Sequence, residues 1–260
     1  METITSVKNE RVKRAAKLAS SSKTRREEGL FVLEGLRLCM DVVRSGLRCA
    51  ELYVSDAFAG KHAAEFEALS AVSDEVFLVN DAVLAKLSDT QTPQGVCCVV
   101  KMPAAADVIG GAEDDANVLL LENVQDPANL GAIARTAEAL GLSGLLVAGG
   151  CDVYAPKALR ASMGALLRLP VETGETAELL ARAKAAGFRC YASTPDADAE
   201  PVNTVDWSGR ALCVVGNEAN GVTPETQAAC DARITIPMAG RAESLNAAAA
   251  GAILMWEMTK

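Results

Sequence analysis

A change from apolar to polar residues within 117–141 places the strongest constraint on the fold. Residues 117–121 are an apolar run with the composition of a buried strand, and the residues up to Asp126 are mostly polar. Asp126 and Pro127 predict the start of a helix, because Asp is a preferred N-cap and Pro is tolerated at the first helical position. A strand that leads through a polar loop into a helix is the unit of an α/β fold.

The same alternation continues through the second half of the chain. We expect further strands at 143–148, 188–193, 210–215 and 232–236, and helices at 127–140, 156–163, 175–186, 223–230 and 244–258. Apolar strands that alternate with helices predict a parallel sheet covered on both faces. Ligands bind outside the carboxyl ends of such strands, and two more polar segments, 214–225 and 236–246, lie at predicted strand ends. We therefore expect one site.

The first half predicts a smaller α/β domain. Its expected strands are 30–34, 49–55, 76–79 and 95–101, and its expected helices are 35–45, 61–69 and 81–87. Residues 103–116 are rich in Ala, Gly and Asp, and their apolar residues follow neither the helical nor the strand period. They predict a linker. The expected organisation is a first domain at 1–102, a linker at 103–116 and a second domain at 117–260.

The charge of the chain is distributed unevenly. The formal net charge is −9, yet residues 1–26 carry +6 because they contain eight Lys and Arg residues and two Glu, so the remainder carries −15. A basic arm on an acidic body is expected where one end contacts phosphate groups, although a solvated amphipathic helix explains the arm equally well when it is taken alone. Its cations are Lys8, Arg11, Lys13, Arg14, Lys17, Lys23, Arg25 and Arg26.

Composition argues against several classes of protein. No apolar stretch is long enough to span a membrane and the N-terminus is polar, so we expect a soluble, cytoplasmic protein. The eight cysteines include no Cys-x-x-Cys pair, and the only histidine is His62, so we expect free thiols and no metal site. We expect His62 to be exposed and to take no part in catalysis.

The polar segments contain the candidate site residues. Asn129 falls in the first turn of its predicted helix, near the strand tip, and Arg135 lies off the apolar stripe. Arg135 is either functional or an exposed side chain paired with Glu138 at i+3. Glu218 belongs to the loop 216–221, whose backbone either closely approaches some other group or simply turns.

The final predicted helix, 244–258, has two notable features. Ser244 is a suitable N-cap for it. Its small residues at 247–251 and bulky residues at 253–256 are apolar on nearly every side, which is more apolar surface than one packing face covers. This pattern predicts that the C-terminal half forms a homodimer.

The three polar segments together resemble the motifs of the SpoU (TrmH-type) family of SPOUT-class RNA methyltransferases. The first motif is similar to Asp126-Pro-x-Asn129-x-Gly131 with Arg135-Thr-Ala, the second to Gly216-x-Glu218-x-x-Gly221, and the third to Ile236-Pro-Met238 with Ser244-Leu-Asn246. The resemblance spans residues 117–258. Residues 31–35 and 92–95 also look like the substrate-binding extension of this family.

This resemblance implies S-adenosylmethionine-dependent 2′-O-methylation of a ribose in structured RNA. The implied fold is a SPOUT-type parallel sheet with a deep trefoil knot, preceded by a small α/β (L30e-like) substrate-binding domain. The implied cofactor-binding residues are Gly216, Asn217, Glu218, Ile236, Met238, Ser244 and Leu245. The implied catalytic residues are Asn129, Arg135, Glu218, Ser244 and Asn246. Arg160, in a further family-like stretch, joins Lys8, Arg11, Lys13, Arg14, Lys23, Arg25 and Arg26 as the expected RNA-binding residues.

Methyl transfer to a ribose hydroxyl makes two chemical demands on such a site. Methyl transfer to a hydroxyl is an in-line displacement, so alignment of the reactants supplies most of the acceleration. A 2′-hydroxyl is a poor nucleophile until its proton is taken. Because the pKa of an arginine is above about 12, we expect Arg135 to position the hydroxyl together with a substrate phosphate, while the proton leaves through phosphate or water. Asn129 and Asn246 would orient the same atoms.

Alternative functions differ in substrate or in chemistry. Ribosomal RNA is favoured over transfer RNA because the N-terminal domain looks like that of rRNA-directed relatives, and a tRNA ribose methyltransferase is the alternative. A second alternative is an RNA-binding protein of this fold without methyl transfer, against which the joint presence of the motif residues argues. A Rossmann dehydrogenase is disfavoured, since residues 121–126 lack Gly-x-Gly-x-x-Gly.

Overall fold

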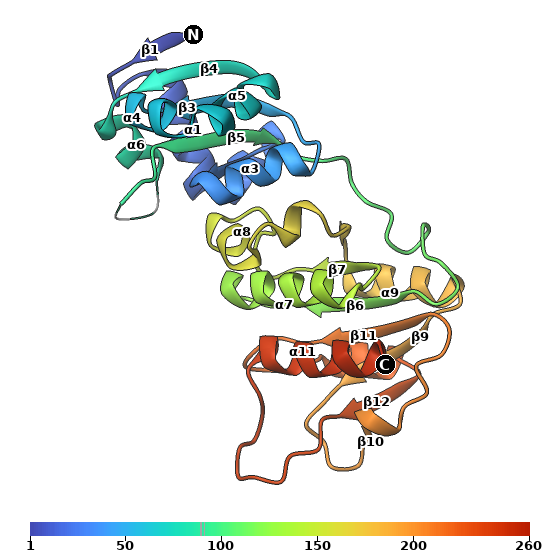
Figure 1. Ribbon diagram of the computed structural model, residues 1–260. Helices are drawn as coiled ribbons and strands as arrows, with labels where there is room; N and C mark the ends of the chain where they lie inside the picture. The colour runs from blue at the N-terminus through green and yellow to red at the C-terminus, as the bar shows by residue number, and fades with distance from the viewer. Residues whose placement is uncertain (89, 91) are drawn as a thin grey trace. The chain divides into compact units, whose positions relative to one another are not determined.

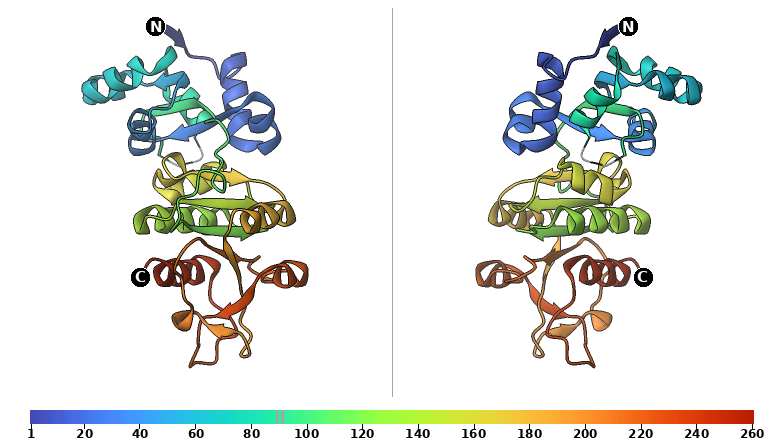
Figure 2. Two further views of the ribbon diagram at one scale, coloured as in Figure 1. Left: turned by 90° about the vertical axis from the view of Figure 1, so that its right-hand side faces the viewer. Right: turned by 90° about the vertical axis from the view of Figure 1, so that its left-hand side faces the viewer.

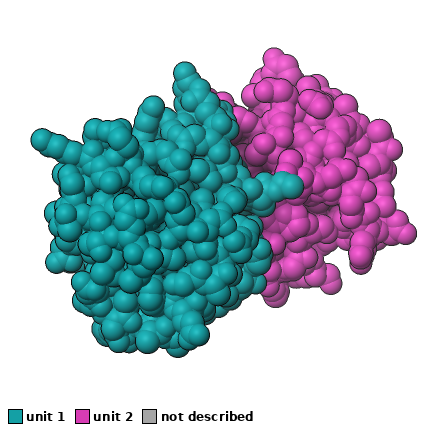
Figure 3. Space-filling view, turned by 90° about the horizontal axis from the view of Figure 1, so that it is seen from above, with its two compact units in different colours: residues 1–104, 152–167 teal, residues 105–151, 168–260 magenta. Residues whose placement is uncertain are grey.

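The computed structural model describes residues 1–88, 90 and 92–260, which form two compact units (Figure 1, and coloured by unit in Figure 3). Unit 1 comprises residues 1–104 and 152–167, and unit 2 comprises residues 105–151 and 168–260. The first boundary falls inside the segment 103–116. The grouping of residues 152–167 with unit 1 was not expected, because a helical pattern does not reveal which core a helix packs against.

Unit 1 is built on a five-stranded mixed sheet in the order β1-β4-β3-β5-β2. β4 is parallel to β1 and β3, whereas β5 is antiparallel to β3 and β2. The strands are β1 (Glu2–Ile4), β2 (Leu30–Glu34), β3 (Cys49–Val54), β4 (Ser73–Val79) and β5 (Val96–Lys101). The helices are α1 (Glu10–Ser20), α2 (Ser22–Glu28), α3 (Leu36–Arg44), α4 (Asp56–Lys61), α5 (Ala63–Ala71), α6 (Asp81–Leu87), α8 (Pro156–Ser162) and the 3-10 turn η1 (Ala165–Leu167).

The basic arm is a folded part of unit 1. Val12, Ala15 and Leu18 recur at helical spacing on α1 and are fully buried. They belong to one core cluster with Tyr53 of β3 and Phe77 of β4, whose ring centroids are 5.2 Å apart. One face of α1 is therefore part of the core of unit 1.

The predicted elements of unit 1 are found with two differences. The helix expected at 61–69 corresponds to α5, and the preceding helix α4, which ends just before His62, was not expected. His62 is partly buried with its ring centroid 5.1 Å from that of Phe58, so the expectation of an exposed side chain was wrong. The short strand β1 was missed because three residues show no period, and only its pairing with β4 defines it.

Unit 2 contains a seven-stranded sheet in the order β10-β12-β9-β11-β6-β7-β8, and each neighbouring pair is parallel, as predicted. The strands are β6 (Asn117–Glu122), β7 (Gly144–Ala148), β8 (Val171–Thr173), β9 (Arg189–Ser193), β10 (Glu200–Pro201), β11 (Ala211–Val215) and β12 (Ala232–Thr235). The helices are α7 (Pro127–Leu140), α9 (Thr176–Ala185), α10 (Pro224–Ala229), α11 (Ala247–Met258) and the 3-10 turn η2 (Val202–Thr204).

Helices cover both faces of this sheet (Figure 2). On one face α7 packs against α11, where a Cβ added to Gly251 would lie 3.3 Å from Ile133. On the other face Leu179 and Leu180 of α9 share a core cluster with Leu120 of β6. Burial on both faces explains why the central strands are continuous apolar runs rather than alternating ones.

The last helix begins later than predicted. α11 starts at Ala247, and its N-cap is Asn246, whose Oδ1 accepts hydrogen bonds from the backbone N–H groups of Ala248 (2.9 Å) and Ala249 (3.3 Å). The predicted N-cap role of Ser244 is therefore wrong. Ser244 lies in the loop before the helix, because Asn246 satisfies the free N–H groups of the first turn.

Candidate functional site

The three polar segments follow strands of the same parallel sheet. β11 lies between β6 and β9, and β9 lies between β11 and β12. Because these strands are parallel, their carboxyl ends face one edge of the sheet. The segments 123–126, 216–223 and 236–246 begin there and lead to α7, α10 and α11 respectively. The prediction that all three lie at carboxyl ends of one parallel sheet is confirmed.

The loop after β11 is closed by its own backbone. Asn217 N donates to Gly221 O at 3.1 Å, and Gly221 N donates to Asn217 O at 2.8 Å. A Cβ added to Gly216 would lie only 2.1 Å from the carbonyl carbon of Gly221, so no larger residue fits without movement of the loop. The close approach expected from the sequence is therefore an approach of this loop to itself.

A chain of side-chain hydrogen bonds joins the three segments. Asn129 Nδ2 donates to Glu218 Oε1 at 2.8 Å, and Asn246 Nδ2 donates to Asn129 Oδ1 at 3.1 Å. A carboxylate only accepts, so Glu218 determines which end of the Asn129 amide carries the hydrogens, and the contact with Asn246 agrees with that orientation. Asn129, at the centre of the chain, is buried.

Glu218 also holds the backbone before α7. Its Oε2 accepts from Gln125 N and its Oε1 from Asp126 N, both at 3.0 Å. Partial burial raises the pKa of Glu218, but the N–H donors of Gln125, Asn129 and Asp126 outweigh burial and leave this pKa below its ordinary value of 4.5. Glu218 is therefore an anion at neutral pH, which accepts hydrogen bonds and does not supply a proton.

A pocket of about 260 Å³ adjoins this chain of hydrogen bonds within unit 2. Ile236 and Leu245 supply apolar surface, whereas Asn217 and Ser244 supply polar groups. The residues that the family resemblance implied for the cofactor all line it: Gly216, Asn217, Glu218, Ile236, Met238, Ser244 and Leu245. One cavity therefore brings together side chains from the second and third segments.

One wall of the pocket was missed in the sequence. This wall lies at the end of β9 and consists of Ser193, Thr194 and Pro195. The sequence signal for it was the same as in the other segments, namely polar residues that follow an apolar strand. Ser193 Oγ donates to Val214 O at 2.7 Å and joins this wall to β11.

Thr194 has an unsatisfied hydroxyl at the pocket. The residue is 7% exposed, and its Oγ1 is buried without a hydrogen bond to any described residue. A buried hydroxyl costs free energy unless it finds a partner. Thr194 is therefore a pocket-lining residue whose hydroxyl has no hydrogen-bond partner among the described residues.

The two remaining predicted site arginines lie elsewhere. Arg135 is exposed on α7 outside the pocket lining, and within the described ranges its side chain makes no hydrogen bond or ion pair. Glu138 pairs with Arg168, so the alternative of an Arg135–Glu138 pair is not found. Arg160 lies on α8, in unit 1.

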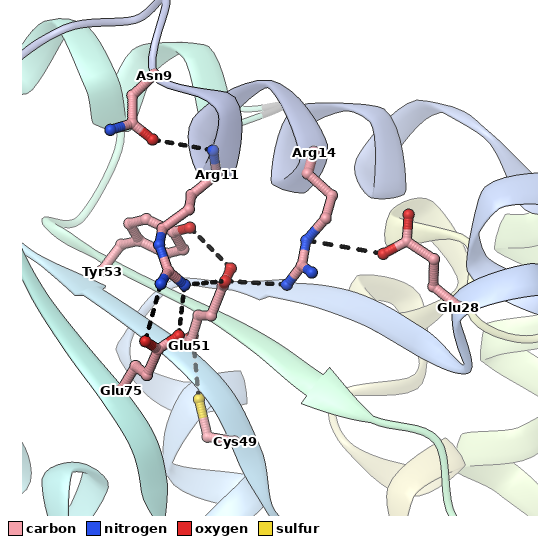
Figure 4. Close-up of polar contacts among 8 residues, drawn as sticks. All are labelled: Asn9, Arg11, Arg14, Glu28, Cys49, Glu51, Tyr53 and Glu75. Carbon is pink, nitrogen blue, oxygen red and sulfur yellow. Dashed lines mark hydrogen bonds and ion pairs between the residues drawn. The ribbon is translucent and has the colours of Figure 1, made fainter.

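Two arginines of α1 are held by acidic residues of the sheet in unit 1 (Figure 4). Glu51 Oε1 accepts from Arg14 Nη2 at 2.9 Å and from Arg11 Nη1 at 3.2 Å. Arg11 also forms a bidentate ion pair with Glu75. Glu51 is 1% exposed, and its Oε2 accepts from Tyr53 Oη at 2.8 Å. Burial and the neighbouring Glu51 raise the pKa of Tyr53, which keeps this hydroxyl a donor. These contacts anchor α1 to the sheet.

Arg25 is an internal anchor too. It is 4% exposed, its Nε donates to Asp152 Oδ2 at 2.7 Å, and its Nη1 donates to Leu18 O at 2.6 Å. A buried guanidinium with these partners is not available to an RNA phosphate, which removes Arg25 from the expected RNA-binding residues. Lys13 and Lys23 pair with glutamates of their own helices at the surface.

Three exposed cations of the basic segment have no ion pair among the described residues. These residues are Lys8, Lys17 and Arg26. They are the positive charges of this segment that internal carboxylates do not neutralise.

Over residues 1–88, 90 and 92–260, no group of three or more His, Cys, Asp or Glu is arranged to hold a metal ion. No helix in the described ranges combines the length and apolarity needed to cross a membrane. The eight cysteines are free thiols, and six of them are buried.

Two family models match the chain. Residues 116–256 match the SpoU rRNA Methylase family, and residues 9–98 match the MRM3-like substrate binding domain. Among named relatives, the 23S rRNA (guanosine(2553)-2′-O)-methyltransferase of Bacillus subtilis is 30% identical and aligns over 99% of both chains. The 23S rRNA (uridine(2479)-2′-O)-methyltransferase of Streptomyces viridochromogenes is 34% identical over 97% of this chain and 90% of that protein.

Solved structures give the same result. The AdoMet-bound rRNA methyltransferase of Sinorhizobium meliloti has a TM-score of 0.88 and 30% identity, covering 99% of this chain and 97% of that one. The SpoU methyltransferase AviRb of Streptomyces viridochromogenes in complex with AdoMet has a TM-score of 0.86 and 28% identity, covering 97% of each chain. The similarity therefore extends over both units.

Proposed function

The chain belongs to the SpoU rRNA Methylase family, and we propose that it transfers a methyl group from S-adenosylmethionine to the 2′-hydroxyl of a ribose in RNA. The observation that carries this proposal is the pocket in unit 2, which is lined by all seven residues that the motifs implied for the cofactor. Ribosomal RNA is the proposed substrate because the two relatives named above, similar over nearly the whole chain, are 23S rRNA methyltransferases.

The pocket residues fit S-adenosylmethionine chemically. Ile236 and Leu245 offer apolar surface to an adenine ring, and the backbone at Gly216 offers polar groups beside it. The free hydroxyl of Thr194 offers a partner to a polar group of the cofactor. When bound, the cofactor supplies an electrophilic methyl group on a sulfonium.

The amide chain supports an orienting role for Asn129 and Asn246. The Asn246 amide donates to the Asn129 amide, and the Asn129 amide donates to Glu218. The dipoles of the two amides are therefore held in fixed directions. Alignment of this kind is the main contribution that a protein makes to an in-line displacement. Ser244 lines the pocket with its hydroxyl, whereas Asn129 and Asn246 are not among the lining residues. We assign Glu218 as a positioning residue, since it is ionised and acts through Asn129.

We propose that Arg135 binds a phosphate of the RNA next to the target ribose. Its exposure and its lack of a partner among the described residues support this role. An arginine stays charged, with a pKa above about 12, so it positions and stabilises rather than takes the proton. In the transfer the carbon–sulfur bond breaks, the carbon–oxygen bond forms, and the hydroxyl proton leaves through phosphate or water.

The proposed phosphate-binding surface of unit 1 is smaller than the sequence suggested. We propose Lys8, Lys17 and Arg26 as its main cations, with Lys13 and Lys23 adding charge that their surface partners only weakly neutralise. Arg11 and Arg14 contribute by holding α1 in place. Arg160 stays a proposed RNA-binding residue.

We also propose that the protein is a homodimer through α11. Trp256 is 56% exposed and Ile253 38% exposed, whereas Leu254 and Met255 are fully buried within the chain. A symmetric pair covers the same exposed apolar patch on both copies. The deep trefoil knot and the cytoplasmic location stay predictions.

Two measurements test the proposed function. Calorimetry of the purified protein with S-adenosylmethionine should give one site per chain, and labelled methyl groups should enter ribosomal RNA taken from cells that lack the protein. Mapping of 2′-O-methyl sites in RNA from cells with and without the protein identifies the nucleotide. Absence of cofactor binding favours an RNA-binding protein without methyl transfer, and label entering only transfer RNA favours the tRNA alternative.

A further inference from the structure

Glu122, the last residue of β6, is a buried carboxylate outside the pocket lining. Its Oε2 accepts from Thr223 N at 2.8 Å, and its Oε1 accepts from Thr223 Oγ1 at 3.0 Å and from Thr226 Oγ1. Thr223 is the N-cap of α10. Glu122 therefore holds the point at which the loop 216–223 ends and α10 begins, with three donors on one carboxylate.

Side chains of the loop 216–223 also reach back to the segment that follows β6. Glu218, within the loop 216–223, accepts backbone N–H groups from the segment 123–126. Asn217 Nδ2, from the same loop, donates to Asn123 O at 3.0 Å. The loop and the tip of β6 are therefore tied by two carboxylates that reach in opposite directions and by one amide.

The segment 123–126 is itself held tightly. Asn123 has a positive φ of 58°, and its N–H donates to Ala148 O at 2.7 Å. A Cβ added to Gly150 would lie 2.2 Å from Val124 O, so the backbones approach as closely as glycine allows. The tip of β6 is therefore closely packed against neighbouring backbone, and Glu122 joins the pocket loop to it.

We propose that Glu122 is a positioning residue for the cofactor pocket. By fastening the end of the loop 216–223 to the tip of β6, it keeps Asn217 and Glu218 at the pocket wall, and through Glu218 it orients Asn129. This inference rests on the proposed function, because it assigns Glu122 a part in binding S-adenosylmethionine. Glu122 acts through the loop and does not line the pocket.

The change Glu122→Gln tests this role with little change in volume. One carboxylate oxygen becomes an NH₂ group, which then faces either the backbone N–H of Thr223 or the hydroxyls of Thr223 and Thr226. A hydroxyl can rotate to accept from the NH₂ group, whereas a backbone N–H cannot, so one orientation of the amide loses the bond to Thr223 N. In either orientation the contacts lose the negative charge that strengthens them. We expect the dissociation constant for S-adenosylmethionine to rise about tenfold. The KM for the cofactor should rise by more than kcat falls.

Thr226→Val provides an independent variant that removes one donor to Glu122 and also lies outside the pocket lining. It should weaken cofactor binding less than Glu122→Gln does. Because both substitutions disrupt the same contact, the double variant should weaken binding by less than the product of the two single effects. Equal affinity in Thr226→Val, Glu122→Gln and wild type would overturn the proposal.

Glu172→Gln is the matched control. Glu172 is also a buried carboxylate at this sheet, accepts from Val108 N at 2.8 Å and pairs with Arg182, but does not line the pocket or contact its loops. It should lower the melting temperature and leave cofactor affinity unchanged at a temperature where all variants are folded. If it weakens binding as much as Glu122→Gln, the effect is general destabilisation and the positioning role is wrong. A wild type that does not bind the cofactor refutes the proposed function instead.

Discussion

The side-chain amide of Asn129 and the carboxylate of Glu218 are joined by a 2.8 Å hydrogen bond between α7 and the loop after β11. The two residues are 89 positions apart in the chain. This bond links the first motif directly to the second. Glu218 accepts from three N–H donors in all. The ionisation of this carboxylate therefore reports on the integrity of the site.

The pH dependence of stability should reflect the lowered pKa of Glu218. Its folded-state pKa lies below the ordinary 4.5, so its contribution is fully present above that value and is lost as pH falls through the folded-state pKa. We expect the difference in melting temperature between wild type and Glu218→Gln to be constant from about pH 5 to 8 and to shrink in acid. The exposed Glu225, changed to Gln, is the control. A difference that varies near neutral pH contradicts the assignment.

Substitution of Arg135 should separate chemistry from folding. Arg135→Ala should lower kcat by roughly 10²- to 10³-fold, because a charge that holds the substrate phosphate is lost. The melting temperature and the cofactor dissociation constant should stay near wild type, since this side chain is exposed and lies outside the pocket lining. Lys184→Ala on α9 is a control for loss of a surface cation. Turnover close to wild type in Arg135→Ala would exclude a role for this residue in catalysis.

Thr194→Val should change stability and binding in opposite directions. The substitution removes a buried hydroxyl that has no partner in the described part of the chain, so the cofactor-free protein should become more stable. Loss of a hydrogen bond to the cofactor should raise its dissociation constant by about two- to tenfold. Thr194→Ser keeps the hydroxyl and should bind nearly as wild type does. Unchanged affinity in the valine variant would mean that this hydroxyl does not face the cofactor.

Removal of unpaired surface cations should weaken RNA binding without unfolding unit 1. A variant with Lys8, Lys17 and Arg26 all changed to Gln should reduce the slope of log affinity against log salt by about two to three. Arg25→Ala should instead lower the melting temperature, because it leaves Asp152 without its buried partner. Deletion of the whole segment would not test RNA binding, since Leu18 is core. An unchanged slope in the triple variant contradicts phosphate contact.

Two neighbouring substitutions on α11 should distinguish interface from core. Trp256→Glu places a charge on exposed apolar surface, and it should halve the mass seen in light scattering and lower activity while the chain stays folded. Met255→Glu buries a charge in the core of a single chain and should unfold it. If wild type already has the mass of a monomer and is fully active, α11 forms no functional interface.

Local signals predicted much of the fold. β2, α6 and α7 have the residue bounds that apolar periodicity and capping residues indicated. For α7, Asp126 and Pro127 determine where the helix starts. β8 and β10 were missed, since strands of three and two residues have no period to read. The predicted N-cap role of Ser244 was wrong, because Asn246 occupies the N-cap position in the fold.

The sequence by itself determined the alternation of strands and helices, the polar strand ends and the residues that resemble the family motifs, because each of these depends on neighbours within one element or loop. The tertiary structure decided which charges are free. Arg11, Arg14 and Arg25 look like solvent-exposed cations in sequence, but Glu51 and Asp152 reach them only in the folded chain. It likewise decided that Glu122 and Glu218 tie two distant loops together, since a hydrogen bond depends on distance in space and not on distance along the chain.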